Sequence, residues 1–141
     1  MKSKHIGVLG AGTWGMALAR MLANSGHDVQ VWSALEREVD LFSETRVHPN
    51  LPGMVIPESI TFTKRIDEIC SEKDILLFAV PSVFVRSTAR NAAPYIPDGQ
   101  IIVDVAKGIE SETLFTMTEV IRDELNKTGG HENVQIGRAH V

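Results

Sequence analysis

The six residues from Gly10 to Gly15, with the sequence GAGTWG, have the spacing G-x-G-x-x-G. An apolar stretch at 5–9 precedes them, and an amphipathic helical pattern at 14–25 follows. In that setting Gly10 permits a tight turn, Gly12 lets the backbone approach a pyrophosphate, and Gly15 lets a helix pack closely on a strand. The unpaired N–H groups at the start of a helix favour an anion. We therefore interpret the motif as a pyrophosphate-binding turn, rather than as a purely structural strand-to-helix turn.

The end of the second expected strand lacks the acidic residue that usually accompanies such a turn. A carboxylate about twenty positions further on commonly binds the ribose 2′-hydroxyl. Here the sequence is Trp32-Ser33-Ala34, and Glu36 comes late enough to serve the N-terminus of its own helix instead. Ser33 could hydrogen-bond a 2′-phosphate, and Arg37 either reaches the same group or lies exposed on its helix. These residues leave the choice between NAD and NADP open and favour NADP.

Two further segments follow expected strands. Val80-Pro81-Ser82 closes the most apolar strand, and Lys107-Gly108 follows the strand at 101–105. Because ligands of open α/β sheets lie beyond the carboxyl ends of the strands, both segments are candidates for ligand contact. A lysine there can pair with a phosphate or a polarised carbonyl oxygen, although a lysine in this position can also be merely solvated.

The periodicity of apolar residues organises the chain into alternating strands and helices. Strands that are apolar throughout and separated by helices indicate a parallel sheet covered on both faces. The sequence therefore predicts a doubly wound α/β domain with a mostly parallel sheet. We expect strands at 5–9, 29–32, 60–62, 74–80, 101–105 and 134–136, helical segments at 14–25, 35–42, 66–69, 82–93 and 114–125, and an irregular stretch at 47–58.

Composition narrows the class of protein. The 141 residues, 43% of them hydrophobic and 23% charged, suit one globular domain, and the net charge of −4 excludes a basic nucleic-acid surface. No apolar run is long enough to span a membrane or to form a signal peptide, so we expect no membrane contact and a cytoplasmic location. Cys70 is the only cysteine and is expected to be a buried apolar residue. The five histidines are scattered singly, so no metal site is expected.

Several short motifs in a fixed order resemble one family, the bacterial NAD(P)-dependent glycerol-3-phosphate dehydrogenases. The motifs are G-x-G-x-W-G-x-A from Gly10 to Ala17, Val31-Trp32, Leu51-Pro52-Gly53, Val80-Pro81-Ser82 and Lys107-Gly108. The resemblance extends to about Gln135 and implies a Rossmann-type dinucleotide-binding domain over residues 1–135. It also implies an enzyme that reduces dihydroxyacetone phosphate to sn-glycerol 3-phosphate by hydride transfer from NADPH or NADH, for phospholipid synthesis.

The resemblance assigns roles to individual residues. Thr13 and Trp14 match cofactor-contacting residues of the glycine motif, and Ala34 falls where many members have a basic or aromatic residue near the adenosine. Phe84 matches a cofactor-contacting aromatic residue in some relatives, with a role in the core as the alternative. Lys107 matches a lysine that touches both cofactor and substrate. The expected cofactor-binding set is Gly10, Gly12, Thr13, Trp14, Gly15, Ser33, Ala34, Pro81, Phe84 and Lys107.

The resemblance also implies parts that this chain does not carry. The family's catalytic lysine and its substrate-phosphate site belong to a helical second domain, where dimer contacts would also lie; after Lys107 this chain has only Lys127. We expect no catalytic residue here and possible homodimerisation of the full-length protein only. Residues 136–141 correspond to one reading frame of a common sequencing adapter and are interpreted as an artefactual tail. The alternatives are a nicotinamide-nucleotide-binding module without catalysis, or the cofactor domain of a 3-hydroxyacyl-CoA or 6-phosphogluconate type of dehydrogenase.

Overall fold

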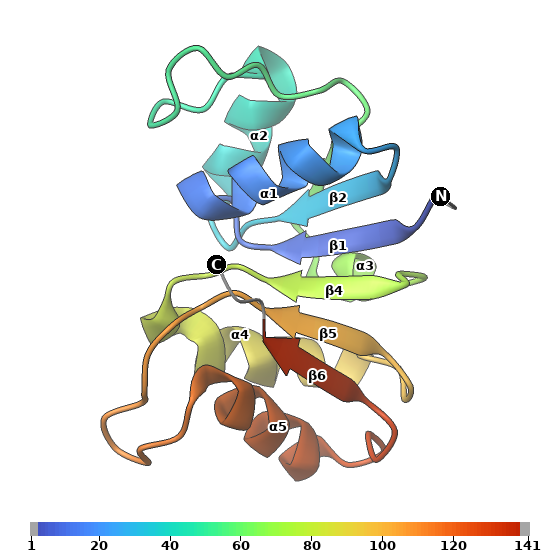
Figure 1. The fold of residues 1–141 in the computed structure, drawn as a ribbon, viewed down its shortest axis with the longest axis vertical. Coiled ribbons are helices and arrows are strands. Elements are labelled where there is room, and N and C mark those ends of the chain that lie inside the picture. Colours follow the sequence, from blue (N-terminus) through green and yellow to red (C-terminus); the bar gives the residue numbers. More distant parts are fainter. Residues whose placement is uncertain (1–2, 139–141) are drawn as a thin grey trace.

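The structure, a computed structural model that describes residues 3–138, contains a six-stranded sheet in the order β3-β2-β1-β4-β5-β6 (Figure 1). Every neighbouring pair in this sheet is parallel. The strands are β1 (His5–Leu9), β2 (Asp28–Trp32), β3 (Thr61–Thr63), β4 (Ile75–Phe78), β5 (Ile101–Asp104) and β6 (Gln135–Arg138). The predicted doubly wound α/β fold is confirmed.

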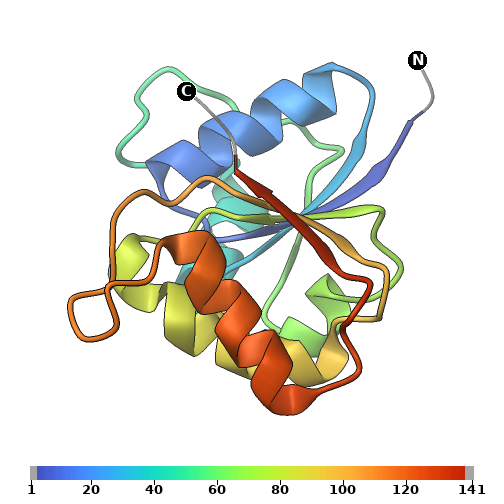
Figure 2. The ribbon, with the colours of Figure 1, turned by 60° about the horizontal axis from the view of Figure 1, so that its bottom comes forward.

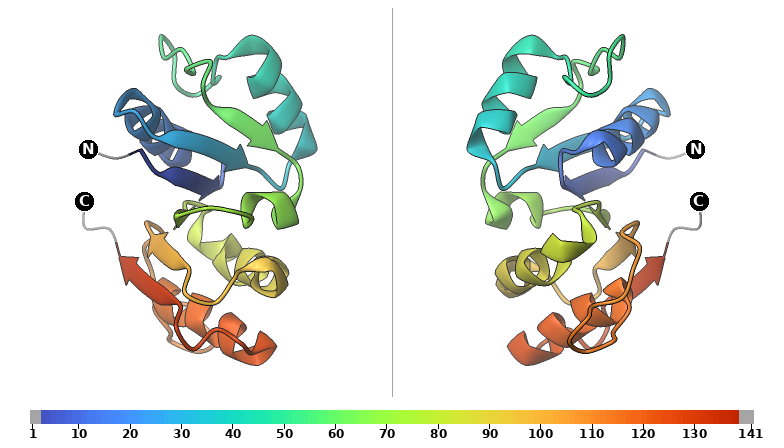
Figure 3. Two further views of the ribbon diagram at one scale, coloured as in Figure 1. Left: turned by 90° about the vertical axis from the view of Figure 1, so that its right-hand side faces the viewer. Right: turned by 90° about the vertical axis from the view of Figure 1, so that its left-hand side faces the viewer.

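Helices cover both faces of the sheet, and each face has its own apolar core. The helical elements are α1 (Thr13–Asn24), α2 (Glu36–Thr45), α3 (Ile66–Ile69), α4 (Val85–Ala92), α5 (Met117–Thr128) and the 3-10 turns η1 (Ser82–Phe84) and η2 (Ala93–Tyr95). Buried residues of α1 and α2 pack with one face, and those of α3, α4 and α5 with the other. Figure 2 shows α1 on one side of the sheet and α4 and α5 on the opposite side. In Figure 3 the arrows of β2 and β6 point to opposite sides of the picture, which shows how far the sheet twists from one edge to the other.

The apolar character of the strands explains this two-faced burial. Val8 in β1 pairs with Val31 in β2 and Leu77 in β4, and all three side chains are buried on the α1 side. Their neighbours Leu76 and Phe78 alternate to the other face and are completely buried there. From β1 the chain adds β2 and β3 on one side and β4, β5 and β6 on the other. In open α/β sheets, ligands bind at the carboxyl ends of the two strands where this change of direction occurs, here β1 and β4.

Some element boundaries differ from the sequence-based expectations. The apolar spacing predicts a last helix that includes Leu114, but α5 begins at Met117, because Thr116 caps it through a reciprocal pair of hydrogen bonds with Glu119. Leu114 instead has a left-handed backbone, with a φ of 62°, and is 74% exposed. The predicted helix at 82–93 is divided, since the turn η1 precedes α4 and the turn η2 follows it.

The third and last strands are also displaced from their predicted positions. The third strand starts one residue later than expected, at Thr61, and the last extends further than expected, to Arg138. The first three residues of the segment interpreted as a tail, 136–138, therefore pair with β5, and residues 139–141 lie outside the described part of the chain. Within the described residues, no helix has the length and apolar character required to cross a bilayer.

Candidate functional site

The glycine turn (residues 10–15) joins β1 to α1 at the carboxyl edge of the sheet, where the arrowheads of the labelled strands in Figure 1 point. Gly10 has a φ of 122° and donates its N–H to the carbonyl oxygen of Trp32, at 2.8 Å, so the turn is bonded directly to the end of β2. A Cβ on Gly10 would lie 2.8 Å from the carbonyl carbon of Ala79, beyond β4. A Cβ on Gly15 would overlap the carbonyl oxygen of Gly10. The turn therefore requires residues without a side chain at these two positions.

Gly12 differs from these two glycines because its missing side chain faces open space. A Cβ built on Gly12 has no heavy atom within 4 Å, and its φ of −71° is open to any residue. Gly12 is the N-cap of α1, yet no side-chain hydrogen bond caps this helix and no acidic residue lies in its first turn. The first N–H groups of α1 therefore have no partner within the helix. Both features suit an anion held by main-chain amides.

The segment after β2 holds a polar contact that the sequence did not reveal. Ser33 is buried, its hydroxyl donates to Glu38 Oε1 at 2.7 Å, and its Oγ accepts the N–H of Leu35 at 3.1 Å. The end of β2 itself carries no carboxylate, as expected, but Glu38 reaches back to it from the first turn of α2. Ala34 and Arg37 are exposed.

The lysine loop (residues 105–110) follows β5 on the other side of the crevice. Asp104, which is completely buried, accepts the N–H of Ala106 at 2.9 Å and so turns the chain immediately before Lys107. Burial raises the pKa of this carboxyl. Gly108 has a φ of 124°, and a Cβ on it would contact Ser82 at 3.8 Å, so the two segments singled out after β4 and β5 lie side by side. Lys107 itself is exposed.

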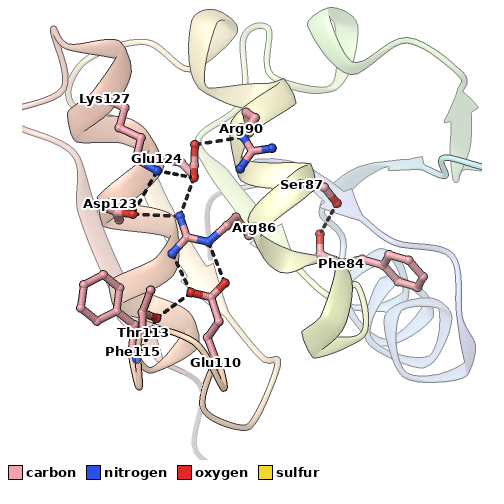
Figure 4. A network of polar contacts seen from close by, with 10 residues as sticks. All are labelled: Phe84, Arg86, Ser87, Arg90, Glu110, Thr113, Phe115, Asp123, Glu124 and Lys127. Carbon is pink, nitrogen blue, oxygen red and sulfur yellow. Dashed lines mark hydrogen bonds and ion pairs between the residues drawn. The ribbon is translucent and has the colours of Figure 1, made fainter.

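A charged network fixes the far end of the lysine loop (Figure 4). The guanidinium of Arg86, on α4, binds both carboxylate oxygens of Glu110, at 2.6 and 2.8 Å, and also contacts Asp123, at 2.8 Å, and Glu124 on α5. The hydrogen bonds from Arg86, and to a lesser extent the one from the Thr113 hydroxyl, hold the pKa of Glu110 at about 2. In turn, the three carboxylates raise the pKa of Arg86. The network thereby ties the lysine loop to two helices.

A buried histidine connects the glycine turn to the irregular segment after α2. His48 is 3% exposed and stacks on Phe42 with ring centroids 4.9 Å apart. Its Nδ1 accepts the N–H of Asn50 at 3.1 Å, so in the neutral ring Nε2 carries the proton and donates to the carbonyl oxygen of Ala11, also at 3.1 Å. Sequence reasoning missed this residue, since nothing local connects it to Ala11.

The remaining candidates divide between the surface and the core. Trp14, in the first turn of α1, is 44% exposed, and Phe84, the last residue of η1, is 56% exposed, so the alternative core role for Phe84 is wrong. Thr13 and Pro81 are also exposed. Cys70 is buried as predicted, and burial raises the pKa of its thiol to about 12.

An all-parallel sheet with this strand order, and a glycine turn leading into an uncapped helix at its switch point, define a dinucleotide-binding domain of the Rossmann type. Residues 5–137 match the family described as NAD-dependent glycerol-3-phosphate dehydrogenase N-terminus. The chain belongs to this family.

Individual relatives agree with that assignment. The chain is 74% identical over 129 residues to the NAD(P)+-dependent glycerol-3-phosphate dehydrogenase 2 of Lactobacillus delbrueckii subsp. bulgaricus, covering 92% of this chain and 38% of the relative. It is 51% identical over 122 residues to the NAD(P)+-dependent glycerol-3-phosphate dehydrogenase of Agathobacter rectalis, covering 86% and 36%. The crystal structure of the Coxiella burnetii glycerol-3-phosphate dehydrogenase superposes with a TM-score of 0.84 at 28% identity, over 96% of this chain and 40% of that one. The chain thus spans about two fifths of the length of these relatives.

Proposed function

We propose that this chain is the cofactor-binding part of an NAD(P)-dependent glycerol-3-phosphate dehydrogenase, an oxidoreductase that interconverts dihydroxyacetone phosphate and sn-glycerol 3-phosphate. The observation that carries the proposal is the glycine turn: α1 has no side-chain cap, and Gly12 opens onto free space at its N-terminus. Membership of the family supports this activity for the full-length enzyme. A dinucleotide held by these residues would supply the hydride that is added to the carbonyl carbon of the substrate.

In this proposal the residues of this chain bind the dinucleotide and orient it. The N–H groups around Gly12, Thr13 and Trp14 hold the pyrophosphate, and Ser33 and Ala34 border the adenosine ribose. Gly10 and Gly15 shape the turn so that those groups converge. Each assignment rests on position at the carboxyl edge of the sheet, where ligands of such sheets bind.

On the other side of the crevice, Pro81 and Phe84 border the cofactor and Lys107 contacts both cofactor and substrate. The exposed ammonium of Lys107 stabilises negative charge on the substrate oxygen or phosphate. The proton for the product hydroxyl comes from a lysine of a second domain, as in the family that the sequence resembles. Lys127 is not a substitute, because its ammonium is engaged by Asp123 and Glu124 at 3.4 and 3.2 Å.

The organisation of the whole protein follows from the same proposal. Residues 1–135 form the dinucleotide-binding domain, residues 136–141 are an artefactual tail, and the helical substrate domain and any homodimer contacts belong to the full-length enzyme. We place that enzyme in the cytoplasm, where its phosphorylated substrate and reduced nucleotides occur. The chain by itself is expected to bind a dinucleotide but not to reduce dihydroxyacetone phosphate; measurable turnover by this chain would contradict the assignment of catalysis to a second domain.

The proposal is tested by placing a negative charge in the glycine turn. Gly12→Asp has room for its side chain, and an aspartate is a favourable N-cap, so the variant should keep or raise the Tm of the wild type. Its carboxylate would face the pyrophosphate, so calorimetric titration with NADH and NADPH should show a loss of affinity of about a hundredfold or more.

Asn24→Asp is the matched control, since it adds the same charge at the other end of α1. We expect its dinucleotide affinity to stay within about twofold of wild type, because surface charges so far apart are screened. Equal affinities for wild type and Gly12→Asp would overturn the assignment of the glycine turn.

A further inference from the structure

Glu38 is held in a defined position at the end of β2. The Ser33 hydroxyl has a single hydrogen, and it is donated to Glu38 Oε1 at 2.7 Å. The Oγ of Ser33 also accepts the N–H of Leu35, so this buried hydroxyl is occupied from both sides. Ser33 therefore has no hydrogen left for a phosphate oxygen, while Glu38 Oε2 remains as an acceptor at the same place.

This carboxylate lies next to the glycine turn. The carbonyl of Trp32, the residue before Ser33, accepts the N–H of Gly10. Glu38 also lines a cavity of about 380 Å³ together with Leu35, Pro49 and His48, the side chain that contacts Ala11 in the turn. A ribose attached to a pyrophosphate at the turn would extend past the end of β2, where this cavity and Glu38 lie.

The charges around this position disfavour a second phosphate. Glu36 and Asp40 lie on the same helix as Glu38, and Lys64 is paired with Asp40 at 2.9 Å. Arg37 is the basic residue within this turn of α2, and its side chain is exposed. A ribose 2′-hydroxyl can donate a hydrogen bond to a carboxylate, whereas a 2′-phosphate presents only acceptor oxygens and negative charge.

We propose that Glu38, positioned by Ser33, accepts a hydrogen bond from the adenosine ribose 2′-hydroxyl and makes this chain prefer NAD over NADP. The inference rests on the proposed function, because it concerns the cofactor bound at the glycine turn. It reverses the preference for NADP that the sequence favoured. The carboxylate escapes the sequence pattern because it comes from the first turn of α2 rather than from the strand end itself.

The test compares the two dinucleotides on the same protein. Wild type should bind NADH at least about tenfold more tightly than NADPH, the size of effect that one charged hydrogen bond carries. Glu38→Gln keeps the shape of the side chain and removes the charge, so the ratio of the two dissociation constants should fall to within about threefold, with NADPH binding improved. Glu36→Gln, which removes an exposed charge from the same helix turn without the Ser33 contact, should change the ratio by no more than about twofold, because a solvated surface charge contributes little.

A second measurement requires no variant. Since repulsion of the 2′-phosphate is electrostatic, raising the salt concentration from about 50 to about 500 mM should reduce the NADH preference of the wild type (concentrations chosen to change the Debye length about threefold). Ser33→Ala, which frees Glu38, should lower the preference only partly.

The outcomes distinguish this inference from the proposed function. Binding of both nucleotides with equal affinity, or tighter binding of NADPH, overturns the inference and leaves the proposed function standing. The inference is likewise overturned if Glu38→Gln folds and retains the full wild-type ratio. Failure of the wild type to bind either nucleotide contradicts the proposed function, and the inference falls with it.

Discussion

The glycine turn and the lysine loop are held in place by different kinds of interaction. The glycine turn is fixed by main-chain contacts and by the buried ring of His48, whose Nε2 contacts the carbonyl oxygen of Ala11. The lysine loop is fixed by Arg86, which binds Glu110 and joins it to the acidic side chains of α5. One side of the same candidate site therefore depends on close packing, and the other on ion pairs.

The difference predicts different responses to solution conditions. Close packing changes little with salt, whereas ion pairs weaken as the salt concentration rises and as their carboxylates become protonated in acid. Variants on each side test that contrast.

Arg86→Leu should have the largest effect on stability. The substitution leaves the carboxylate of Glu124, which is 3% exposed, with only its longer contacts to Lys127 and Arg90, and leaves Glu110 and Asp123 without their guanidinium partner. Loss of one partner from such a partly buried network costs about 2 to 3 kcal/mol of unfolding free energy, measurable as a lower urea midpoint.

Arg90→Ala is the control for this variant. Arg90 is 62% exposed and contacts Glu124 at 3.5 Å, so its loss should cost less than about 1 kcal/mol. Equal urea midpoints for Arg86→Leu and Arg90→Ala would show that the network contributes nothing beyond an ordinary surface ion pair.

Local sequence patterns predicted the fold and the glycine turn, because both depend on residues close together in the chain. The glycine spacing from Gly10 to Gly15, between a strand and a helix, predicts the turn by itself, and strands that are apolar throughout predict a sheet covered on both faces. Periodicity misled at Leu114, since the helical spacing of apolar residues extends to the N-terminal side of Thr116, the N-cap at which the helix begins.

The side chains that position the site could not be found in this way. His48 lies 37 residues from Ala11, and Arg86 lies 24 residues from Glu110 and 38 from Glu124. Only the folded sheet brings these pairs together, because each partner belongs to a different loop or helix. The pair Ser33 and Glu38 is nearer in sequence, but a turn of helix must form before the carboxylate faces back to the strand.

His48→Ala tests the packed side of the comparison and should have a smaller effect than Arg86→Leu. Loss of the ring removes the hydrogen bond to Ala11 and the stacking on Phe42, so dinucleotide affinity should fall about three- to tenfold through a looser turn. The loss should be the same at low and high salt. His48→Gln, which can still donate, should recover part of the affinity.

His131→Ala is the matched control for that variant. His131 is also buried, but its ring contacts the carbonyls of Leu125 and Ile96 near the amino ends of the strands, away from the glycine turn. Its loss should lower stability and leave dinucleotide affinity unchanged. If both histidine variants lose affinity equally, His48 acts only through general stability.

The smallest expected effect is the acid response of the charged side. The hydrogen bond from Arg86 holds the pKa of Glu110 at about 2, below its usual 4.5, and lowers the pKa of Asp123 in the same way. A carboxyl with a lowered pKa stabilises the folded protein above its unfolded pKa and loses that contribution as the pH falls toward the folded value. The Tm difference between wild type and Arg86→Leu should therefore stay constant from about pH 7 to pH 5 and shrink between about pH 4.5 and pH 2.

Asp104 works in the opposite direction, because burial raises its pKa, but it is present in both proteins and cancels in the difference. Thermal unfolding of both proteins across this range measures the effect, and a difference independent of pH would mean that the carboxylates are not ionised partners of Arg86.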